Sequence, residues 1–71
     1  MRKFGEKIRT LRESCELTHR QLAAELGVTH SHLVHMEVGR RVPSVELLIK
    51  LAAYFEVTTD QLLNDKIKLD L

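Results

Sequence analysis

The sequence predicts an all-α fold, one compact domain of five short helices. Apolar residues recur at intervals of three and four along nearly the whole chain, which is the period of an α-helix. Serine or threonine begins four of the five periodic segments and glycine follows two of them, and these residue types favour helix starts and stops. Seventy-one residues suffice for one domain with a single small core.

The first two helices are predicted by an apolar stripe and by a capping box. Residues at i, i+4, i+7 and i+11 form the stripe of a helix over residues 2–15: Phe4, Ile8, Leu11 and Cys15. We expect the lone cysteine to be a small core residue of this helix. Thr18, with Gln21 three residues later, begins a second helix that Gly27 ends.

The remaining helices are shorter or more apolar. Thr29 caps a third helix that ends near residue 38, before Gly39. Ser44 caps a fourth helix that runs to about residue 55, and Thr59 caps a short fifth turn. The expected domain covers residues 1–64, and the tail, residues 65–71, includes alternating apolar residues typical of a strand. This tail either pairs with a second copy or is frayed.

Charge and composition narrow the class of protein. The net charge is +1, but residues 1–41 carry eight Lys and Arg against five Asp and Glu, whereas residues 42–71 carry three against five. The basic surface therefore belongs to the N-terminal part. A single cysteine permits no internal disulfide, and no apolar run approaches the ~20 residues of a membrane span, so we expect a soluble cytoplasmic protein. No catalytic spacing or phosphate loop indicates an enzyme or a cofactor.

The second and third helices have the spacing of a helix-turn-helix motif. Their connection is only about three residues long. Apolar or small residues stand at each position where the two helices and the turn must pack: Leu22, Ala23, Leu26, Gly27, Val28, Leu33 and Met36. Seven such residues in register indicate the motif strongly.

Three histidines in "VTHSHLVHMEVGRR" raise the question of a metal site. At about 100° per residue, Leu33, Met36 and Glu37 lie on the inward side of the third helix. His30 and His35 lie on the outward side and His32 on the flank, so the three imidazoles cannot converge on one ion. We therefore expect no metal and interpret the outward side as a surface for a polyanion.

The stretch "LTHRQLAAELGVTHSHLVHMEVGRRVPSVELLIKLAAYFEVTTDQLL", with "IRTLRE" before it, resembles the Cro/lambda-repressor-like, or XRE-type, helix-turn-helix family. Glu16 departs from the glycine usual there, and Val38 from a common polar residue. The resemblance implies a dimeric transcription factor of five helices, whose third helix enters the major groove. It places base-contacting residues at His30, Ser31, Val34 and His35.

Phosphate contacts are expected on either side of these base contacts. The start of the second helix offers backbone N–H groups and a positive dipole end, and a loop with two arginines follows the third helix. The expected phosphate-contacting residues are Thr18, His19, Arg20, His32, Arg40 and Arg41. The resemblance also implies a structural ion pair between Arg12 and the inward-facing Glu37, because a half-buried carboxylate needs a partner.

The most favoured function is a sequence-specific regulator, a repressor, that binds a double-stranded DNA operator as a homodimer. A single domain covers only one half-site, and several apolar residues are difficult to bury in so small a core. These residues form the expected dimer interface: Leu47, Tyr54, Leu63, Ile67, Leu69 and Leu71. An alternative is an antitoxin that binds a toxin partner as well as its own promoter.

Overall fold

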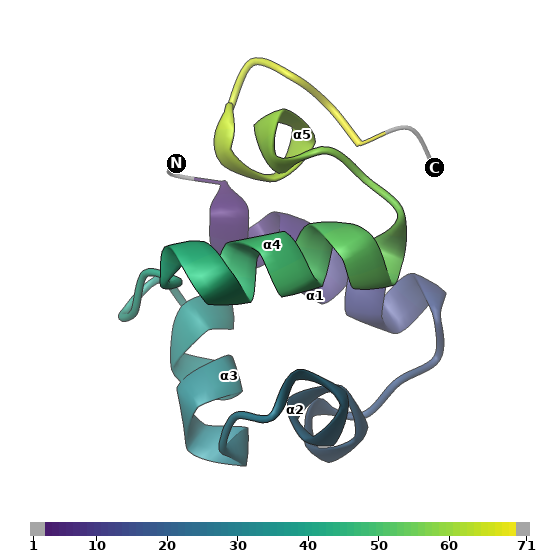
Figure 1. Cartoon of the computed structure of the whole chain (residues 1–71), viewed down its shortest axis with the longest axis vertical. Helices are drawn as coiled ribbons and strands as arrows, with labels where there is room; N and C mark the ends of the chain where they lie inside the picture. Colours follow the sequence, from purple (N-terminus) through teal and green to yellow (C-terminus); the bar gives the residue numbers. More distant parts are fainter. Residues whose placement is uncertain (1–2, 70–71) are drawn as a thin grey trace.

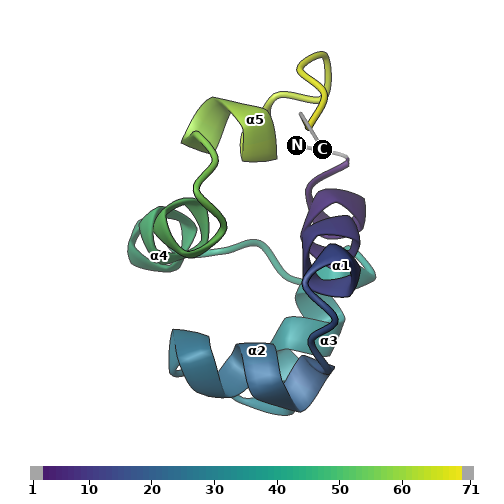
Figure 2. The same cartoon turned by 90° about the vertical axis from the view of Figure 1, so that its right-hand side faces the viewer.

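Residues 3–69 are described by a computed structural model. Within them the five predicted helices are confirmed, in the order α1 (Phe4–Ser14), α2 (His19–Leu26), α3 (His30–Glu37), α4 (Val45–Phe55) and α5 (Thr59–Leu63). Figure 1 shows α4 in front of α1, with α2 and α3 below them and α5 above. Figure 2 separates α4 and α1 to opposite sides of the molecule. The helix-turn-helix pair therefore occupies one end of the domain and α5 the other.

The core lies where the inward stripes of all five helices meet. It is formed by eleven buried apolar side chains: Phe4, Ile8, Leu11, Leu22, Ala23, Leu26, Leu33, Met36, Leu47, Leu51 and Leu62. Cys15, expected in this core, is exposed instead. It is the C-cap of α1, with φ −93° and ψ 4°, so it follows the last helical residue and leaves the direction of the stripe.

Side-chain caps fix the starts of four helices. Thr18 and Gln21 form the predicted capping box, and the hydroxyls of Thr29 and Ser44 each accept a backbone N–H three residues on. The predicted cap of α5 was wrong by one residue. Thr58, with ψ 158°, accepts from the backbone N–H of Gln61, whereas Thr59 is already helical.

Two glutamates adopt the backbone conformation that favours glycine. Gly27 and Gly39 have φ 72° and 86°, as expected of residues that end helices. Glu16 has φ 56° and Glu56 has φ 55°, at the ends of α1 and α4. Glu16 thus takes the left-handed conformation that its family-related glycine would take, at a cost of roughly 1–2 kcal/mol for a residue with a Cβ.

The third glycine, Gly5, allows α1 and α3 to touch. A Cβ added at Gly5 would lie 2.6 Å from the carbonyl oxygen of Met36 and closer still to that of Glu37. Both neighbours are backbone atoms at the end of α3, so they cannot move aside as a side chain would. The position of α3 against α1 therefore depends on the absence of a side chain at this residue.

Lys7 joins α1 to the C-terminal part of the chain. Its ammonium group is buried and donates to the carbonyl oxygens of Gln61 (2.5 Å), Asn64 (2.8 Å) and Ile67 (2.6 Å). Three donors thus meet three acceptors, which offsets the cost of burying the charge. The Gln61 and Asn64 carbonyls belong to the last turn and the C-cap of α5, where a cation is favourable.

The expectation of a frayed tail is wrong for the described residues, and pairing of the tail with a second copy stays a prediction. Residues 65–69 form turns and no strand. They are not frayed either, because Ile67 accepts a hydrogen bond from Lys7 and Leu69 packs on the core. The lysine satisfies a carbonyl that a pairing strand would need, so these residues are held against the domain.

Candidate nucleic-acid interface

A tight turn sets the angle between α2 and α3. The backbone N–H of Val28 donates to the carbonyl of Ala23 at 3.0 Å, and Gly27 takes a left-handed conformation between them. Ala23 is buried, as predicted for a position where the two helices come close. Thr29 then begins α3 by accepting from the backbone N–H of His32. The crossing is therefore fixed by local bonds of the turn itself.

The two sides of α3 differ as the predicted helical wheel indicates. Leu33 and Met36 are fully buried in the core. His30 and Ser31 are exposed at the beginning of the helix, and Val34 and His35 are half-buried further along it. The structure thus places the four predicted base-contacting residues on the side away from Leu33 and Met36. Their contact with DNA stays a prediction.

The side chain of His32, on α3, points toward the start of α4. Together with Ser44, Leu47 and Lys50 it lines a shallow hollow on that side of α3. Its Nε2 is buried and has no hydrogen-bond partner among the described residues. That nitrogen does not face solvent, and the phosphate contact predicted for His32 stays a prediction. Its position at about 200° on the wheel indicated a flank but not which neighbour would cover it.

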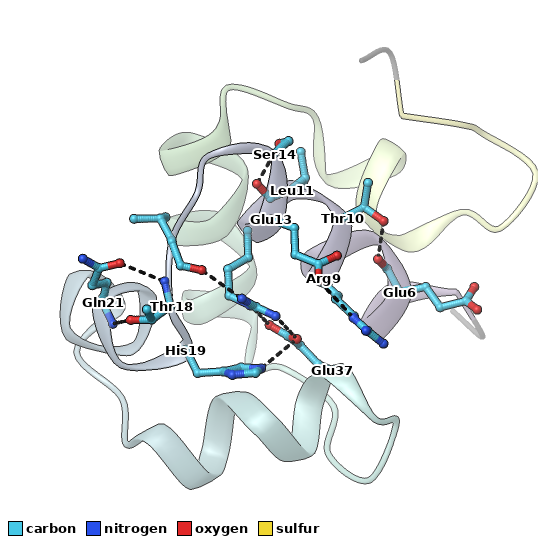
Figure 3. Close-up of polar contacts among 12 residues, drawn as sticks. Glu6, Arg9, Thr10, Leu11, Glu13, Ser14, Thr18, His19, Gln21 and Glu37 are labelled. Atoms are coloured by element: carbon cyan, nitrogen blue, oxygen red, sulfur yellow. Dashed lines mark hydrogen bonds and ion pairs between the residues drawn. The ribbon is translucent and has the colours of Figure 1, made fainter.

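Glu37 is the centre of a buried ion pair that joins three helices (Figure 3). Its side chain is 4 % exposed and accepts from Arg12 Nε at 2.8 Å and from Arg12 Nη2 at 3.2 Å. Arg12 Nη1 donates to the carbonyl oxygen of Leu17 at 2.8 Å. The hydrogen bonds to Glu37 raise the pKa of Arg12, with smaller coulombic contributions from Glu37 and Glu13, against desolvation, which lowers it. The geometry is that of the structural pair expected from the sequence.

His19 is the second partner of this carboxylate. Its Nε2 lies 3.0 Å from Glu37 Oε1, and its ring meets that of His30 edge-on at a centroid distance of 5.8 Å. The sequence interpretation gave His19 to a DNA phosphate, but the structure uses one of its nitrogens inside the protein. The side chain is still about a third exposed, at 34 %, so only its other nitrogen can face an anion. His19 therefore also links α2 to α3.

The remaining predicted phosphate contacts lie on the surface. Arg20, Arg40 and Arg41 are exposed, the first on α2 and the others on the loop after α3. The backbone N–H of Arg40 donates to the carbonyl of His35 at 2.8 Å, so that N–H ends the helix and is not available to a phosphate. Thr18 uses its hydroxyl as an acceptor and its backbone N–H as a donor within the capping box. The side chains of the three arginines are exposed donors on this rim.

The residues expected to form a dimer interface differ in their exposure. Leu47 is 6 % exposed and belongs to the core, which removes the reason for its assignment. Leu63 and Leu69 pack partly on the core. Tyr54 and Ile67 are exposed, and Leu71 lies outside the described residues. The assignment of Leu47 to the interface is wrong, because the sequence does not show which side of α4 faces the core.

Sequence reasoning missed three strongly exposed apolar side chains. Val42 in the loop, and Val45 and Ile49 on α4, are 71 %, 75 % and 58 % exposed. A signal existed, because α4 carries charge only at Glu46 and Lys50 and is apolar elsewhere around its circumference. A helix with apolar residues on two sides is typically covered on both.

These observations define the class of protein. A three-residue crossing, a second helix with a polar outer side, and exposed arginines on either side of it are the parts of a helix-turn-helix DNA-binding domain. The HTH_3 model, described as helix-turn-helix, matches residues 8–62. The chain belongs to this family of DNA-binding transcriptional regulators, which confirms the resemblance and the non-enzymatic class predicted from the sequence.

Individual relatives carry the same domain in longer proteins. The chain is 38 % identical over 61 residues to the transcriptional activator BcrR of Enterococcus faecalis, covering 86 % of this chain and 30 % of BcrR. It is 38 % identical over 64 residues to the transcriptional repressor RghR of Bacillus subtilis, covering 89 % and 47 %. The chain thus spans less than half the length of either relative.

A solved structure confirms the architecture. The N-terminal DNA-binding domain of SinR from Bacillus subtilis superimposes with a TM-score of 0.83 at 28 % identity, covering 96 % of this chain and all of that domain. Within residues 3–69 no helix is long and apolar enough to cross a membrane. In the same part of the chain no group of three His, Cys, Asp or Glu side chains has an arrangement that could hold a metal ion.

Proposed function

We propose that this chain binds double-stranded DNA as a homodimer, with α3 in the major groove, and represses the promoter that it occupies. The observation that carries the proposal is the exposure of His30 and Ser31 at the beginning of α3. Residues at this end of a recognition helix are the ones that meet base edges. Imidazole N–H and serine hydroxyl groups donate to purine acceptors in the major groove.

The arginines support the same orientation. Arg20 lies in the first turn of α2, and Arg40 and Arg41 follow α3, so positive charge borders the outer side of α3 at both ends of the motif. Phosphate contacts from such positions set the register of the helix in the groove and supply affinity that depends on salt. Repression is the simpler regulatory outcome, because occupancy of a promoter by the dimer is sufficient to exclude another protein.

Selection of bound sequences from random DNA, followed by titration of variants, tests this function. We expect Ser31→Ala and His35→Ala to alter the preference at particular base pairs, each by about 1–3 kcal/mol. Arg41→Ala should weaken binding to all sequences alike and lower the slope of log affinity against log salt by about 0.9.

Lys68→Ala is the matched control, because Lys68 is exposed on the tail beside α5, at the end of the molecule opposite the motif (Figure 1). It should leave affinity and salt slope unchanged. Equal losses for the Arg41 and Lys68 variants would contradict the proposed orientation. Transcription from a promoter that carries the selected sequence should fall when the protein is added, and a rise would replace repression by activation.

A further inference from the structure

The outward side of α4 is an apolar surface that residues 3–69 leave uncovered. Val45 and Ile49 are 75 % and 58 % exposed, and Ala53 continues the same line at intervals of four residues. Leu47 and Leu51, on the other side of the helix, are buried in the core. With Val42 just before the helix, we name this set, Val42, Val45, Ile49 and Ala53, the α4 face. Exposed apolar surface of this kind marks an interaction site.

We propose that the α4 face binds the α4 face of a second copy of this chain, with the two helices antiparallel about a twofold axis. The proposal names the dimer contact that the proposed function requires, and it rests on that function only for its consequence on DNA. It differs from the interface expected from the sequence, since Leu47 is buried and the described part of the tail is held by Lys7.

Charge at the edge of the face favours a second copy over an unrelated partner. Glu46 and Lys50 lie on one flank of α4, 3.8 Å apart, and both side chains are more than half exposed. A twofold axis between them keeps this flank on the same side in both copies and reverses the direction of the helix. Glu46 then faces the second copy's Lys50, and Lys50 faces the second copy's Glu46. The surface is therefore complementary to itself, as an isologous interface must be.

The position of α4 is compatible with DNA binding by both copies. Figure 2 shows α4 at one side of the molecule, with α2 and α3 at the lower end, so a second copy on the outward side of α4 does not cover α3. The twofold operation turns both motifs toward the same side. The domain measures 28 × 23 × 20 Å, so equivalent points of two adjoining copies are separated by distances of the order of one turn of DNA, about 34 Å.

The size of the face determines how strong the contact is. Three exposed aliphatic side chains and one alanine make an apolar patch of a few hundred Å². This is less than the roughly 800 Å² per partner of a standard stable interface. We therefore expect a weak dimer in free solution that forms fully on DNA with two half-sites, where the first bound copy raises the local concentration of the second.

Two charge variants test the contact by mixing. Glu46→Lys gives one flank two positive side chains, and Lys50→Glu gives it two negative ones. Each variant alone should sediment as a monomer at concentrations where the wild-type chain dimerises. An equimolar mixture should regain the dimer, because every pair across the axis is then of opposite charge. The ion pair between residues 46 and 50 of one helix cannot explain this result, because each variant chain still carries two like charges at these two positions in the mixture.

The DNA arm separates this contact from DNA binding itself. Each variant should bind a single half-site with wild-type affinity, lose cooperative binding to two half-sites, and recover it in the mixture. Dimerisation without DNA binding would leave the α4 contact intact and overturn the proposed function. Half-site binding with a chain that stays monomeric, both alone and on two half-sites, would overturn the α4 contact.

A pair of isoleucine variants provides an independent readout. Ile49→Ser should weaken self-association about tenfold, as expected for the central apolar residue of an interface. Ile67→Ser is the matched control, because Ile67 is also exposed but lies on the tail beside α5. Its self-association should remain within about twofold of the wild-type value. A larger loss for Ile67→Ser than for Ile49→Ser would move the interface to the tail and overturn the proposal.

Discussion

Replacement of Arg12 by alanine should remove a large part of the stability of the domain. In the native protein Glu37 accepts two hydrogen bonds from Arg12, and its side chain is 4 % exposed. Arg12→Ala leaves one carboxylate oxygen with no partner and the other with His19 alone, and it also removes the donor to the Leu17 carbonyl. Breaking a buried pair from one side costs about 3–5 kcal/mol.

That loss is comparable with the whole stability expected for a domain of this size. At about 0.05–0.15 kcal/mol per residue, seventy-one residues give roughly 4–11 kcal/mol. A change of 1 kcal/mol shifts the Tm of such a domain by about 4–8 °C, so Arg12→Ala should lower Tm by roughly 10–40 °C. Thermal and urea unfolding followed by circular dichroism measure the effect.

Arg9→Ala is the control within the same helix. Arg9 pairs with Glu13 at 3.6 Å, and both side chains are more than half exposed. Such a surface pair contributes at most about 0.5 kcal/mol. The double variant Arg12→Met with Glu37→Leu should recover most of the loss, because it leaves no buried charge. If Arg12→Ala and Arg9→Ala unfold at the same temperature, the Glu37 pair has no structural role.

The pair should act independently of pH in the neutral range. The hydrogen bonds from Arg12 to Glu37 raise the pKa of the arginine above its ordinary value. A raised pKa of a base contributes stability that is fully present below the ordinary value and is lost only as the pH rises through the folded value. The difference in unfolding free energy between the wild type and Arg12→Ala should therefore not decline between about pH 6 and 9. A difference that declines with pH across this window would contradict the assignment.

Four further substitutions test the fold by thermal unfolding. Gly5→Ala should prevent stable folding, because its Cβ would collide with two backbone carbonyls of α3, whereas Gly27→Ala meets no neighbour and should cost only about 1–2 kcal/mol. Lys7→Met keeps the apolar stem but removes three hydrogen bonds to carbonyls, and should cost about 2–4 kcal/mol. Glu16→Gly should instead stabilise by about 0.5–1 kcal/mol, since φ 56° suits glycine; no gain would mean that Glu16 is not strained.

The sequence predicts the fold well because its signals are local. Caps, glycine stops and the helical period each involve residues within one or two turns, so they can be recognised without knowledge of the packing. The first four helices begin and end within two residues of the predicted positions, and α5 begins within two residues of its predicted start. The pair between Arg12 and Glu37 was accessible for another reason, since a half-buried carboxylate requires a cation and the resemblance indicated which one.

The errors concern contacts between residues far apart in the chain. Lys7 stands one turn after Phe4, on the buried side of α1, and only the folded position of the carbonyls after α5 explains a lysine there. His19 is similar, because its partner Glu37 lies eighteen residues away on another helix. Polar residues were assigned to DNA when their sequence position allowed it. The structure shows that some of them also hold the helices together.

The fourth helix shows why a wheel alone cannot locate an interface. Leu47 and Ile49 are two residues apart and point to different sides of α4, and both sides are apolar in the sequence. A wheel orders these residues around the axis but gives no direction toward the core when the apolar positions surround it. Packing of α4 against α2 and α5 places Leu47 inside and leaves Ile49 exposed. Because α4 is apolar on both sides, the sequence does not show which side faces the core. The apolar residues on the exposed side are also the reason to expect a second copy there.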